Sequence, residues 1–245
     1  MKYSFVIPYF KRPSLSMTLL SFKHFYGNRK DYEVVLVEDK KNFEDGDAHA
    51  QLIEIINKHK ESVSIKHFVS EFDNYACPCS MINYGADMAE GEFVIMTNPE
   101  CAHVTDILSG FDEELAKNKN VYVVAACANG GVQTKVPDSF EGFTYAQSKW
   151  YQHSVHYNRC LNWCTVLSKE NYIKVGGFNE EFDNGLGRAD VQFAKMVRKA
   201  VPFVLRDDLI CVHQAHSREH QFTAERRQLI SNNHSCKIFR SRFKK

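Results

Sequence analysis

The first half of the chain alternates short apolar segments with amphipathic ones, and this alternation limits the folds open to it. The apolar segments, such as residues 3–8, are runs of β-branched and aromatic residues typical of strands buried on both faces. The segments between them carry apolar residues at helical spacing, as at Leu15, Leu19 and Phe22. The pattern predicts strands over 3–8, 33–37, 63–69, 93–96 and 121–126, with helices over 14–25, 48–59, 80–89 and 106–117. It therefore predicts an α/β fold with a mostly parallel central sheet and helices on both faces.

The second half is less regular but continues the same domain. Residues 128–158 hold paired glycines and many aromatic side chains, which predicts a long excursion over the sheet edge. Beyond it the pattern predicts strands over 161–167, 202–205 and 209–213, and helices over 169–174 and 190–199. With 245 residues, no internal repeat and no visible linker, the chain is expected to form a single domain with a sizeable core.

Composition excludes several classes of protein. A charged fraction of 25% and an apolar fraction of 44% are typical of a folded chain. A formal charge of +1 excludes a globally basic nucleic-acid binder. The sequence has no secretory signal and no apolar run of the roughly 20 residues that a membrane span needs. The eight cysteines match neither a disulfide scaffold nor a paired zinc motif, so we expect reduced, mostly buried thiols and a cytoplasmic location.

Two carboxylates follow predicted strands at equivalent places. Asp39 ends the strand over 33–37, and Glu100 follows the strand over 93–96. Either residue alone could be an ordinary turn or N-cap residue. Together they favour a ligand site, because ligands of such sheets bind beyond the carboxyl ends of the strands.

Four segments, in order, resemble the inverting glycosyltransferases of family 2, which have the GT-A fold. They are an opening strand, a strand ending in an acidic pair, an N-x-G helix leading through an A-x-G turn into a strand, and a G-G-F-N-E-E segment with acidic residues after it. These segments occupy residues 5–12, 34–39, 83–100 and 176–190. The resemblance implies a single GT-A domain over 1–216, with a nucleotide-binding half (1–126) and an acceptor-binding half (127–216).

The resemblance also assigns the donor and metal residues. It implies that the nucleotide-sugar, UDP-linked by this analogy, contacts six residues: Pro8, Tyr9, Arg12, Asp39, Asn83 and Asn98. Asn98-Pro99-Glu100 stands where the family has its D-x-D metal motif, so Glu100 remains as a ligand while Asn98 removes one charge. A Pro-containing turn is the structural alternative.

A histidine completes the expected metal site. His213 follows the last predicted strand and is the second expected ligand, while His216 is expected to contact phosphate. Imidazole suits Mn²⁺ better than Mg²⁺, so Mn²⁺ is favoured and Mg²⁺ is the alternative.

Asp190 is the expected catalytic residue. Inversion is a single displacement in which the acceptor hydroxyl loses a proton, and a carboxylate can accept it as general base. The family has two adjacent acids here, whereas this chain has Ala189-Asp190. The structural alternative is that Asp190 caps the helix that follows it.

The acceptor is expected to bind Trp150, Arg159, Gly177 and Phe178. An aromatic ring can stack on a sugar face and an arginine can bind phosphate, although an aromatic cluster can equally belong to the core.

The C-terminal segment 217–245 is basic. It has eight basic residues against two acidic ones, a net charge of +6, so the rest of the chain carries −5. Such a tail can contact an anionic partner or form a solvated helix.

The sequence thus predicts a metal-dependent inverting glycosyltransferase that uses a nucleoside-diphosphate sugar and a hydroxyl acceptor, a glycan or a modified nucleic-acid base. A nucleotidyltransferase is disfavoured because residues 9–13 hold no glycine. A non-catalytic nucleotide-sugar or glycan-binding module is the alternative suggested by the two missing acids.

Overall fold

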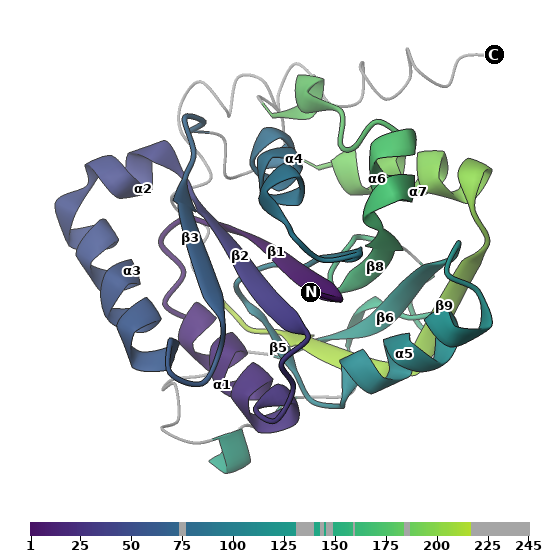
Figure 1. The fold of residues 1–245 in the computed structure, drawn as a ribbon, viewed down its shortest axis with the longest axis horizontal. Coiled ribbons are helices and arrows are strands. Elements are labelled where there is room, and N and C mark those ends of the chain that lie inside the picture. Colours follow the sequence, from purple (N-terminus) through teal and green to yellow (C-terminus); the bar gives the residue numbers. More distant parts are fainter. Residues whose placement is uncertain are drawn as a thin grey trace.

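The computed structural model describes residues 1–73, 77–130, 140–142, 145, 149–158, 160–183 and 187–216. Within these residues one nine-stranded sheet runs through the molecule, with strand order β3-β2-β1-β4-β8-β6-β9-β5 and β7 paired to β6 (Figure 1). The first four strands in this order form a parallel block. They are β3 (Ile65–Val69), β2 (Tyr32–Glu38), β1 (Tyr3–Tyr9) and β4 (Phe93–Met96).

The remaining strands mix parallel and antiparallel pairing. They are β8 (Thr165–Ser168), β6 (Tyr122–Asn129), β9 (Phe203–His213), β5 (Cys101–His103) and β7 (Trp150–Gln152). The longest ladder of this part, between β6 and β9, is parallel, whereas β8 runs antiparallel to both β4 and β6. The predicted fold class, an α/β fold with a mostly parallel sheet, is confirmed.

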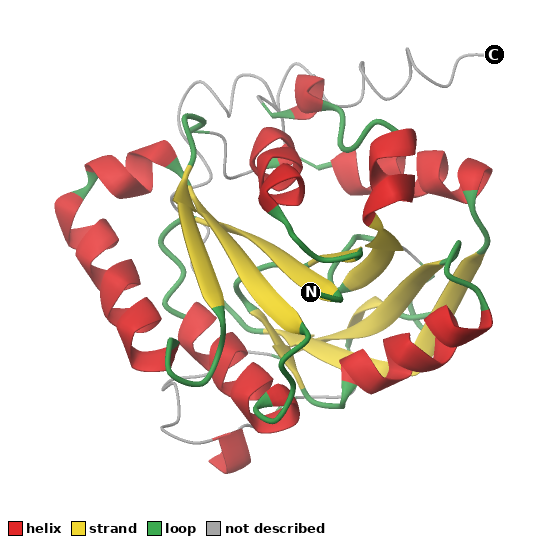
Figure 2. Cartoon of the chain, viewed as in Figure 1, coloured by secondary structure: helices red, strands yellow, loops and turns green. Residues whose placement is uncertain are grey.

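Helices cover both faces of the sheet, as Figure 2 shows. One face carries α1 (Leu15–Tyr26), α3 (Gly46–His59) and α5 (Ile107–Lys117), and the other carries α4 (Cys79–Met88), α6 (Lys169–Lys174) and α7 (Ala189–Ala200). The short elements are α2 (Lys40–Glu44) and two 3₁₀ turns, η1 (Phe140–Gly142) and η2 (Glu180–Phe182). Along β1, Phe5 and Ile7 pack into the first layer while Val6 packs into the second. Because both faces are buried, the middle of the strand, Phe5 to Ile7, is a continuous apolar run.

Close packing of α4 depends on Gly85. A Cβ at this position would lie 2.6 Å from Cγ1 of Val6 and 2.9 Å from Cγ2 of Val37. The absent side chain lets α4 lie directly on β1 and β2, and it explains the glycine of the N-x-G helix in structural terms.

Two predicted elements have different bounds in the structure. The strand expected over 161–167 begins only at Thr165, because Asn162 (φ 56°) and Cys164 (φ 96°) adopt positive φ angles that interrupt an extended chain. The strands expected over 202–205 and 209–213 are one strand, β9. In its register Ala125 pairs with Arg206 and Ala126 with Ile210, so residues 207–209 form an irregularity inside β9.

The proposed division at 126/127 falls inside β6, so both halves share one continuous sheet. Of the excursion predicted over 128–158, the structure describes the end of β6 with Gly130, then η1, Tyr145 and residues 149–158, which contain β7 and an isolated bridge between His153 and Tyr157. The basic tail 217–245 lies outside the described residues. Among the described helices, none combines the length and apolar character that crossing a bilayer requires.

The cysteines within the described part of the chain are buried and unpaired, as the sequence predicts. Three of them, Cys101, Cys127 and Cys211, come from β5, β6 and β9, and their sulfur atoms all lie within 4.8 Å of one another. Cys127 and Cys211 are register partners across the β6–β9 ladder. Their spacing in the sequence gives no sign of this cluster, because it depends on strand order.

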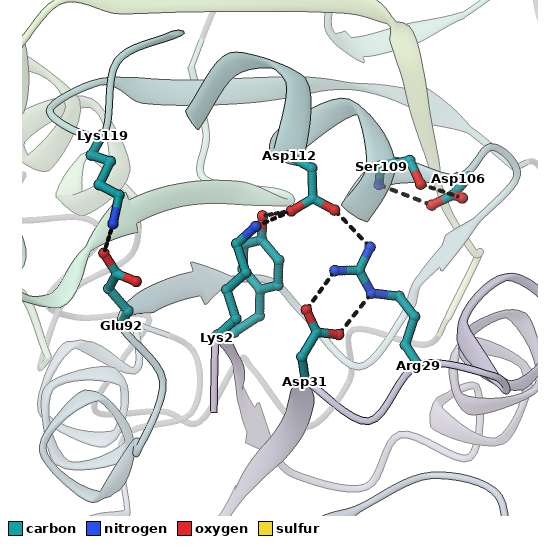
Figure 3. A network of polar contacts seen from close by, with 9 residues as sticks. Lys2, Arg29, Asp31, Glu92, Asp106, Ser109, Asp112 and Lys119 are labelled. Atoms are coloured by element: carbon teal, nitrogen blue, oxygen red, sulfur yellow. Dashed lines mark hydrogen bonds and ion pairs between the residues drawn. The ribbon is translucent and has the colours of Figure 1, made fainter. Parts of the chain in front are cut away.

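A polar network closes the amino end of the sheet (Figure 3). Asp112 on α5 accepts hydrogen bonds from Lys2, from the hydroxyl of Tyr3 (2.7 Å) and from Nη1 of Arg29 (2.8 Å). Arg29 also donates two hydrogen bonds to Asp31, at 2.9 and 2.7 Å. The network thus ties α5 to β1 and to the turn before β2.

Replacing Asp112 by Asn should lower the free energy of unfolding by about 1–2 kcal/mol at pH 7, because charge-assisted hydrogen bonds are lost. Burial raises the pKa of Asp112, but the bonds from Arg29, Lys2 and Tyr3 outweigh it and hold the pKa below its ordinary value. The stabilisation is therefore present above about pH 4 and is lost as the pH falls below it.

Urea unfolding at pH 7 and pH 3 measures this effect. Lys119→Gln is the matched control, since Lys119 pairs with Glu92 on the exposed surface and its loss should cost at most about 0.5 kcal/mol. Equal stability of Asp112→Asn and the parent at pH 7 would contradict the role given to the network.

Candidate functional site

A carboxylate and two histidines meet at the carboxyl edge of the sheet. Oε1 of Glu100 lies 3.3 Å from Nε2 of His213 and 3.3 Å from Nε2 of His216. The antiparallel pairing of β5 and β9 places Cys101, the first residue of β5, opposite His213, the last residue of β9. Glu100 directly precedes β5 and is therefore brought next to His213. The predicted ligands Glu100 and His213 are thus brought together, and His216 joins them as an equal neighbour.

Gln214 locks this arrangement in place. Its backbone N–H donates to the carbonyl of Glu100 at 2.9 Å. Its side-chain Nε2 donates to the carbonyl of Ser14 and to Oγ1 of Thr18, both at 3.2 Å, and Thr18 in turn donates to the carbonyl of Pro99 at 2.7 Å. The turn that carries Glu100 is therefore fixed to both α1 and the end of β9. The Pro-containing turn that was the structural alternative does exist, and it positions the carboxylate.

Glu100 is ionised in this setting. It is 5% exposed, and burial raises its pKa, but hydrogen bonds and charge from His213 and His216 outweigh burial and hold the pKa well below its usual range. Its second oxygen, Oε2, accepts no hydrogen bond from any residue the structure describes, and Nε of the buried Arg12 lies 4.0 Å from it.

The three side chains suit a divalent cation. Their ligand atoms all lie within 4.8 Å of one another, and an ionised carboxylate with two imidazoles is a donor set that transition-metal ions such as Mn²⁺ accept. The buried carboxylate oxygen without a hydrogen-bond donor is a further reason to expect a cation there.

Asp190 lies in the first turn of α7. The helix begins at Ala189 after Arg188, whose φ is 74°, and the Arg188 side chain makes no capping hydrogen bond. Arg188 and not Asp190 thus holds the N-cap position that was the structural alternative for Asp190, although an acid in the first turn still lies where the helix dipole favours negative charge. Burial raises its pKa to about 6, against a lowering contribution from the side chain of Asn162.

Asn162 orients this carboxylate. Its Nδ2 lies 3.4 Å from both Oδ1 and the carbonyl oxygen of Asp190. Its own Oδ1 accepts the hydroxyl of the buried Tyr122, which fixes the amide so that the NH₂ group faces Asp190. The positive φ of Asn162, which delays the start of the predicted strand to Thr165, thus places Asn162 beside the acid.

One cavity of about 180 Å³, called here the first cavity, joins these groups. Its lining includes Asn98, Glu100, Trp163, Asp190, His213 and His216. This single space thus holds the expected metal ligands, the expected general base and one expected donor residue. Arg12 is close to it, because its Nε lies 4.0 Å from Oε2 of Glu100.

Other predicted donor residues lie at the ends of β1 and β2. Pro8 and Tyr9 end β1, and the backbone N–H of Asp39 donates to the carbonyl of Tyr9 at 2.9 Å. Asp39 also caps α2 by accepting from the N–H of Lys41 at 2.8 Å, which is the structural alternative considered for it. These three residues are grouped as predicted, at the carboxyl edge of the sheet.

Asn83 lies elsewhere. Its Nδ2 donates to the carbonyl of Phe178 at 2.9 Å, and its Oδ1 accepts from the hydroxyl of Tyr172 and from the N–H of Phe178, at 2.7 and 2.9 Å. It also borders Gly177, where a Cβ would lie 2.6 Å from Oδ1. Asn83 therefore ties α4 to the Gly176-Gly177-Phe178 turn, and it does not line the first cavity.

The predicted acceptor residues are dispersed. Phe178 lines the first cavity and stacks on Phe193 at a centroid distance of 4.2 Å, while Gly177 forms the turn before it with φ 63°. Trp150 stands on β7 and packs against His153, away from the first cavity. Arg159 lies outside the described residues.

Trp163 and Asn162 lie at the site although the sequence pattern does not mark them as site residues. Trp163 lines the first cavity and packs against His213 at a centroid distance of 4.2 Å, with Tyr151 stacked on its ring at 4.8 Å. Both residues were expected inside a strand. An Asn-Trp pair that interrupts an apolar run next to two cysteines was the available signal, since Asn tolerates positive φ.

No protein-family model matches the chain, and no curated protein matches it. Solved structures do share its fold. The crystal structure of S. aureus TarS 1–349 has a TM-score of 0.66 and 16% identity, covering 87% of this chain and 60% of that one. Mannosyltransferase PcManGT from Pyrobaculum calidifontis, solved with GDP-Man and Mn²⁺, has a TM-score of 0.62 and 15% identity over 98% of this chain and 64% of that one. GalNAc-T7 with UDP, GalNAc and Mn²⁺ has a TM-score of 0.64 and 13% identity, covering 92% of this chain and 46% of that one.

At these identities the likeness concerns the fold. This chain spans about 60% of the length of the TarS 1–349 structure. The structural neighbours are glycosyltransferases of GT-A-like fold, and TarS has been solved with UDP and with UDP-GlcNAc. The fold of this chain is therefore the GT-A-like fold of glycosyltransferases.

Proposed function

We propose that this protein is a metal-dependent inverting glycosyltransferase that moves a sugar from a nucleoside-diphosphate donor, UDP-linked, to a hydroxyl acceptor. The observation that carries the proposal is the first cavity, where an ionised carboxylate with two histidines and a second carboxylate of raised pKa face one space. A transferase of this kind needs both groups: one to hold the cation that binds the diphosphate, and one to accept a proton.

Glu100, His213 and His216 would hold the cation. Mn²⁺ fits this donor set better than Mg²⁺, because two of the three ligand atoms are imidazole nitrogens. When bound, the cation supplies neutralisation of the charge on the departing diphosphate. His216, first expected to contact phosphate, becomes a ligand in this proposal because it lies as close to Glu100 as His213 does.

The remaining donor contacts follow the edge of the sheet. Pro8, Tyr9 and Asp39 would bind the nucleoside beyond the ends of β1 and β2. Asn98 lines the first cavity between that region and Glu100, within reach of a ribose or a cation-bound water. Arg12, buried beside Glu100, adds positive charge where a diphosphate would lie.

Asp190 would act as the general base. The acceptor hydroxyl attacks the anomeric carbon as the bond to the diphosphate breaks, and its proton passes to the Asp190 carboxylate. A pKa of about 6 leaves this group ionised at neutral pH yet basic enough to accept a proton. Asn162, fixed by Tyr122, orients the carboxylate toward the cavity that both acids share.

The comparisons support the donor class. TarS has been solved with UDP and UDP-GlcNAc, and PcManGT and GalNAc-T7 with Mn²⁺ and a nucleotide ligand. We further propose the division into a nucleotide-binding half over 1–126 and an acceptor-binding half over 127–216. The buried, unpaired cysteines of the described chain favour a reducing compartment, and we propose the cytoplasm.

Titration calorimetry with UDP, with and without Mn²⁺, tests the proposal. UDP should bind in the presence of Mn²⁺ and more weakly with Mg²⁺, and one nucleoside-diphosphate sugar in a panel should be hydrolysed or transferred. Failure of UDP and GDP to bind with any divalent cation would refute the proposal. Nucleotide-sugar binding without turnover on any acceptor would favour the binding-module alternative.

A further inference from the structure

A second cavity of about 580 Å³ adjoins the first. Its lining includes Asn158, Leu161, Arg188, Asp190, Lys195 and Arg198. It shares Gly187 and Asp190 with the first cavity, so the two meet at the proposed general base. Because an acceptor hydroxyl must reach Asp190 from outside the donor site, the second cavity is where an acceptor would lie.

The wall formed by α7 is positively charged. Three cationic residues line it: Arg188 at the N-cap of α7, and Lys195 and Arg198 within the helix. Val191 and Ala194 lie between them in the sequence. The spacing of three or four residues places all five on one face of the helix. Asp190 is the only acidic residue among those that line this cavity within the described chain. All three cationic side chains are exposed, so an anion can reach them from solvent.

Arg198 is held in a defined place. Its guanidinium carbon lies 3.9 Å from the centroid of the Phe203 ring, at the start of β9. This stacking fixes the planar group while leaving its N–H donors available for a planar or tetrahedral anion. Of the described lining residues outside α7 and its cap, Asn158, Cys160 and Leu161 carry no charge.

We propose that the acceptor is anionic and carries a phosphate or carboxylate group that binds Lys195 and Arg198, with Arg188 near the reacting hydroxyl. This inference rests on the proposed function and names the acceptor class of that same site. With a rise of about 1.5 Å per residue, Lys195 and Arg198 lie about 8 and 12 Å along the axis from Asp190. The acceptor would therefore carry its charge about 8–12 Å from the hydroxyl that reacts, measured along the axis of α7.

The donor's own diphosphate does not account for these cations. The proposed cation ligands and Arg12 gather around Glu100 in the first cavity, whereas none of the three cations on α7 lines that cavity. Two separate positive regions therefore flank Asp190, one suited to the diphosphate and one to the acceptor.

Binding of matched disaccharides tests the inference. Trehalose 6-phosphate, lactobionate and neutral trehalose are titrated into the whole chain by calorimetry at low salt. Trehalose 6-phosphate or lactobionate should bind at least tenfold more tightly than trehalose, and the difference should shrink as salt screens the charges. The preferred anion distinguishes a phosphate-bearing from a carboxylate-bearing acceptor.

Variants locate the binding. The triple variant Arg188→Gln, Lys195→Gln, Arg198→Gln should lose at least tenfold in affinity for the anionic disaccharide while UDP binding stays unchanged. Lys199→Gln, on the same helix but outside the second cavity, should behave as the parent. Unfolding transitions of all variants verify that each is folded.

The two proposals fail differently. If UDP binds but trehalose, trehalose 6-phosphate and lactobionate bind equally, or if the triple variant keeps its anion affinity, the anionic-acceptor inference is overturned and the glycosyltransferase proposal stands. If neither UDP nor GDP binds in the presence of any divalent cation, the proposed function falls, and with it the acceptor role of the second cavity, whatever the disaccharides show.

Discussion

Replacing Asp190 by Asn should reduce the rate of sugar transfer by about 10²–10⁴-fold, the contribution typical of a general base, while UDP and Mn²⁺ bind as in the parent. An amide can accept the hydrogen bond from Asn162 but cannot take the proton of the acceptor hydroxyl. Initial rates at saturating donor, together with calorimetry, separate these effects. Asp106→Asn is a matched control, since Asp106 caps α5 on the other face of the sheet and its loss should leave transfer unchanged.

The same carboxylate should govern the pH dependence. Because burial raises the pKa of Asp190 from 3.8 to about 6, the group is protonated and inactive below that pH. The rate should therefore fall about tenfold per pH unit below about pH 6.

Stability should move in the opposite direction. A carboxyl whose folded pKa is raised stabilises the fold below its unfolded pKa, and this contribution is lost as the pH rises through the folded value. Asp190→Asn removes the ionisable group. Its free energy of unfolding should therefore exceed that of the parent by about 1–3 kcal/mol at pH 8 and equal it near pH 3.5. A variant that keeps full activity, or gains no stability at pH 8, would contradict the environment assigned to Asp190.

Replacing Glu100 by Gln should weaken Mn²⁺-dependent UDP binding by at least about 100-fold. Removing a direct ligand should lower the metal affinity by more than the 10–100-fold that is typical when a residue that only supports a ligand is removed. The amide keeps the size of the side chain but removes the charge that faces His213 and His216. His213→Ala should give a similar loss, measured as Mn²⁺-supported UDP affinity by calorimetry.

His156→Ala serves as the control for histidine removal. His156 is exposed and stacks beside Trp150, and it does not line either cavity. Its replacement should leave UDP affinity within twofold of the parent. Undiminished Mn²⁺-dependent binding in Glu100→Gln would exclude the Glu100, His213 and His216 cluster as the cation site.

The sequence predicted those parts of the fold that depend on local patterning. Buried strands are recognisable as apolar runs in the sequence. Ligands of parallel sheets bind beyond the carboxyl ends of the strands, so the position of Glu100 after such a run indicated a site. The helix predicted over 190–199 corresponds to α7 (Ala189–Ala200), so the position of Asp190 in its first turn was also predictable.

What the sequence did not reveal depends on contacts between distant segments. Strand β5 has three residues and forms only because β9 pairs with it, so no local pattern marks it. Asn162 looks like part of a strand until its φ of 56° is known. Asn83 stands in the N-x-G motif, and only the structure reveals that its side chain accepts hydrogen bonds from Tyr172 and Phe178. His216 was undervalued because its approach to Glu100 depends on the chain after β9.

The side chain of Gln214 donates to the carbonyl of Ser14, 200 positions away in sequence, and its backbone N–H and side-chain Nε2 both donate to the carbonyl of Glu100, 114 positions away. Loops this long close slowly during folding, because chain entropy is lost before the contacts form. The parallel block β3-β2-β1-β4 needs only the first 96 residues, so it can assemble while later segments are still unstructured. The cation cluster, by contrast, exists only once β9 has docked. The cation site proposed for Glu100, His213 and His216 would therefore form later in folding than the parallel block, because it needs the pairing of β5 with β9.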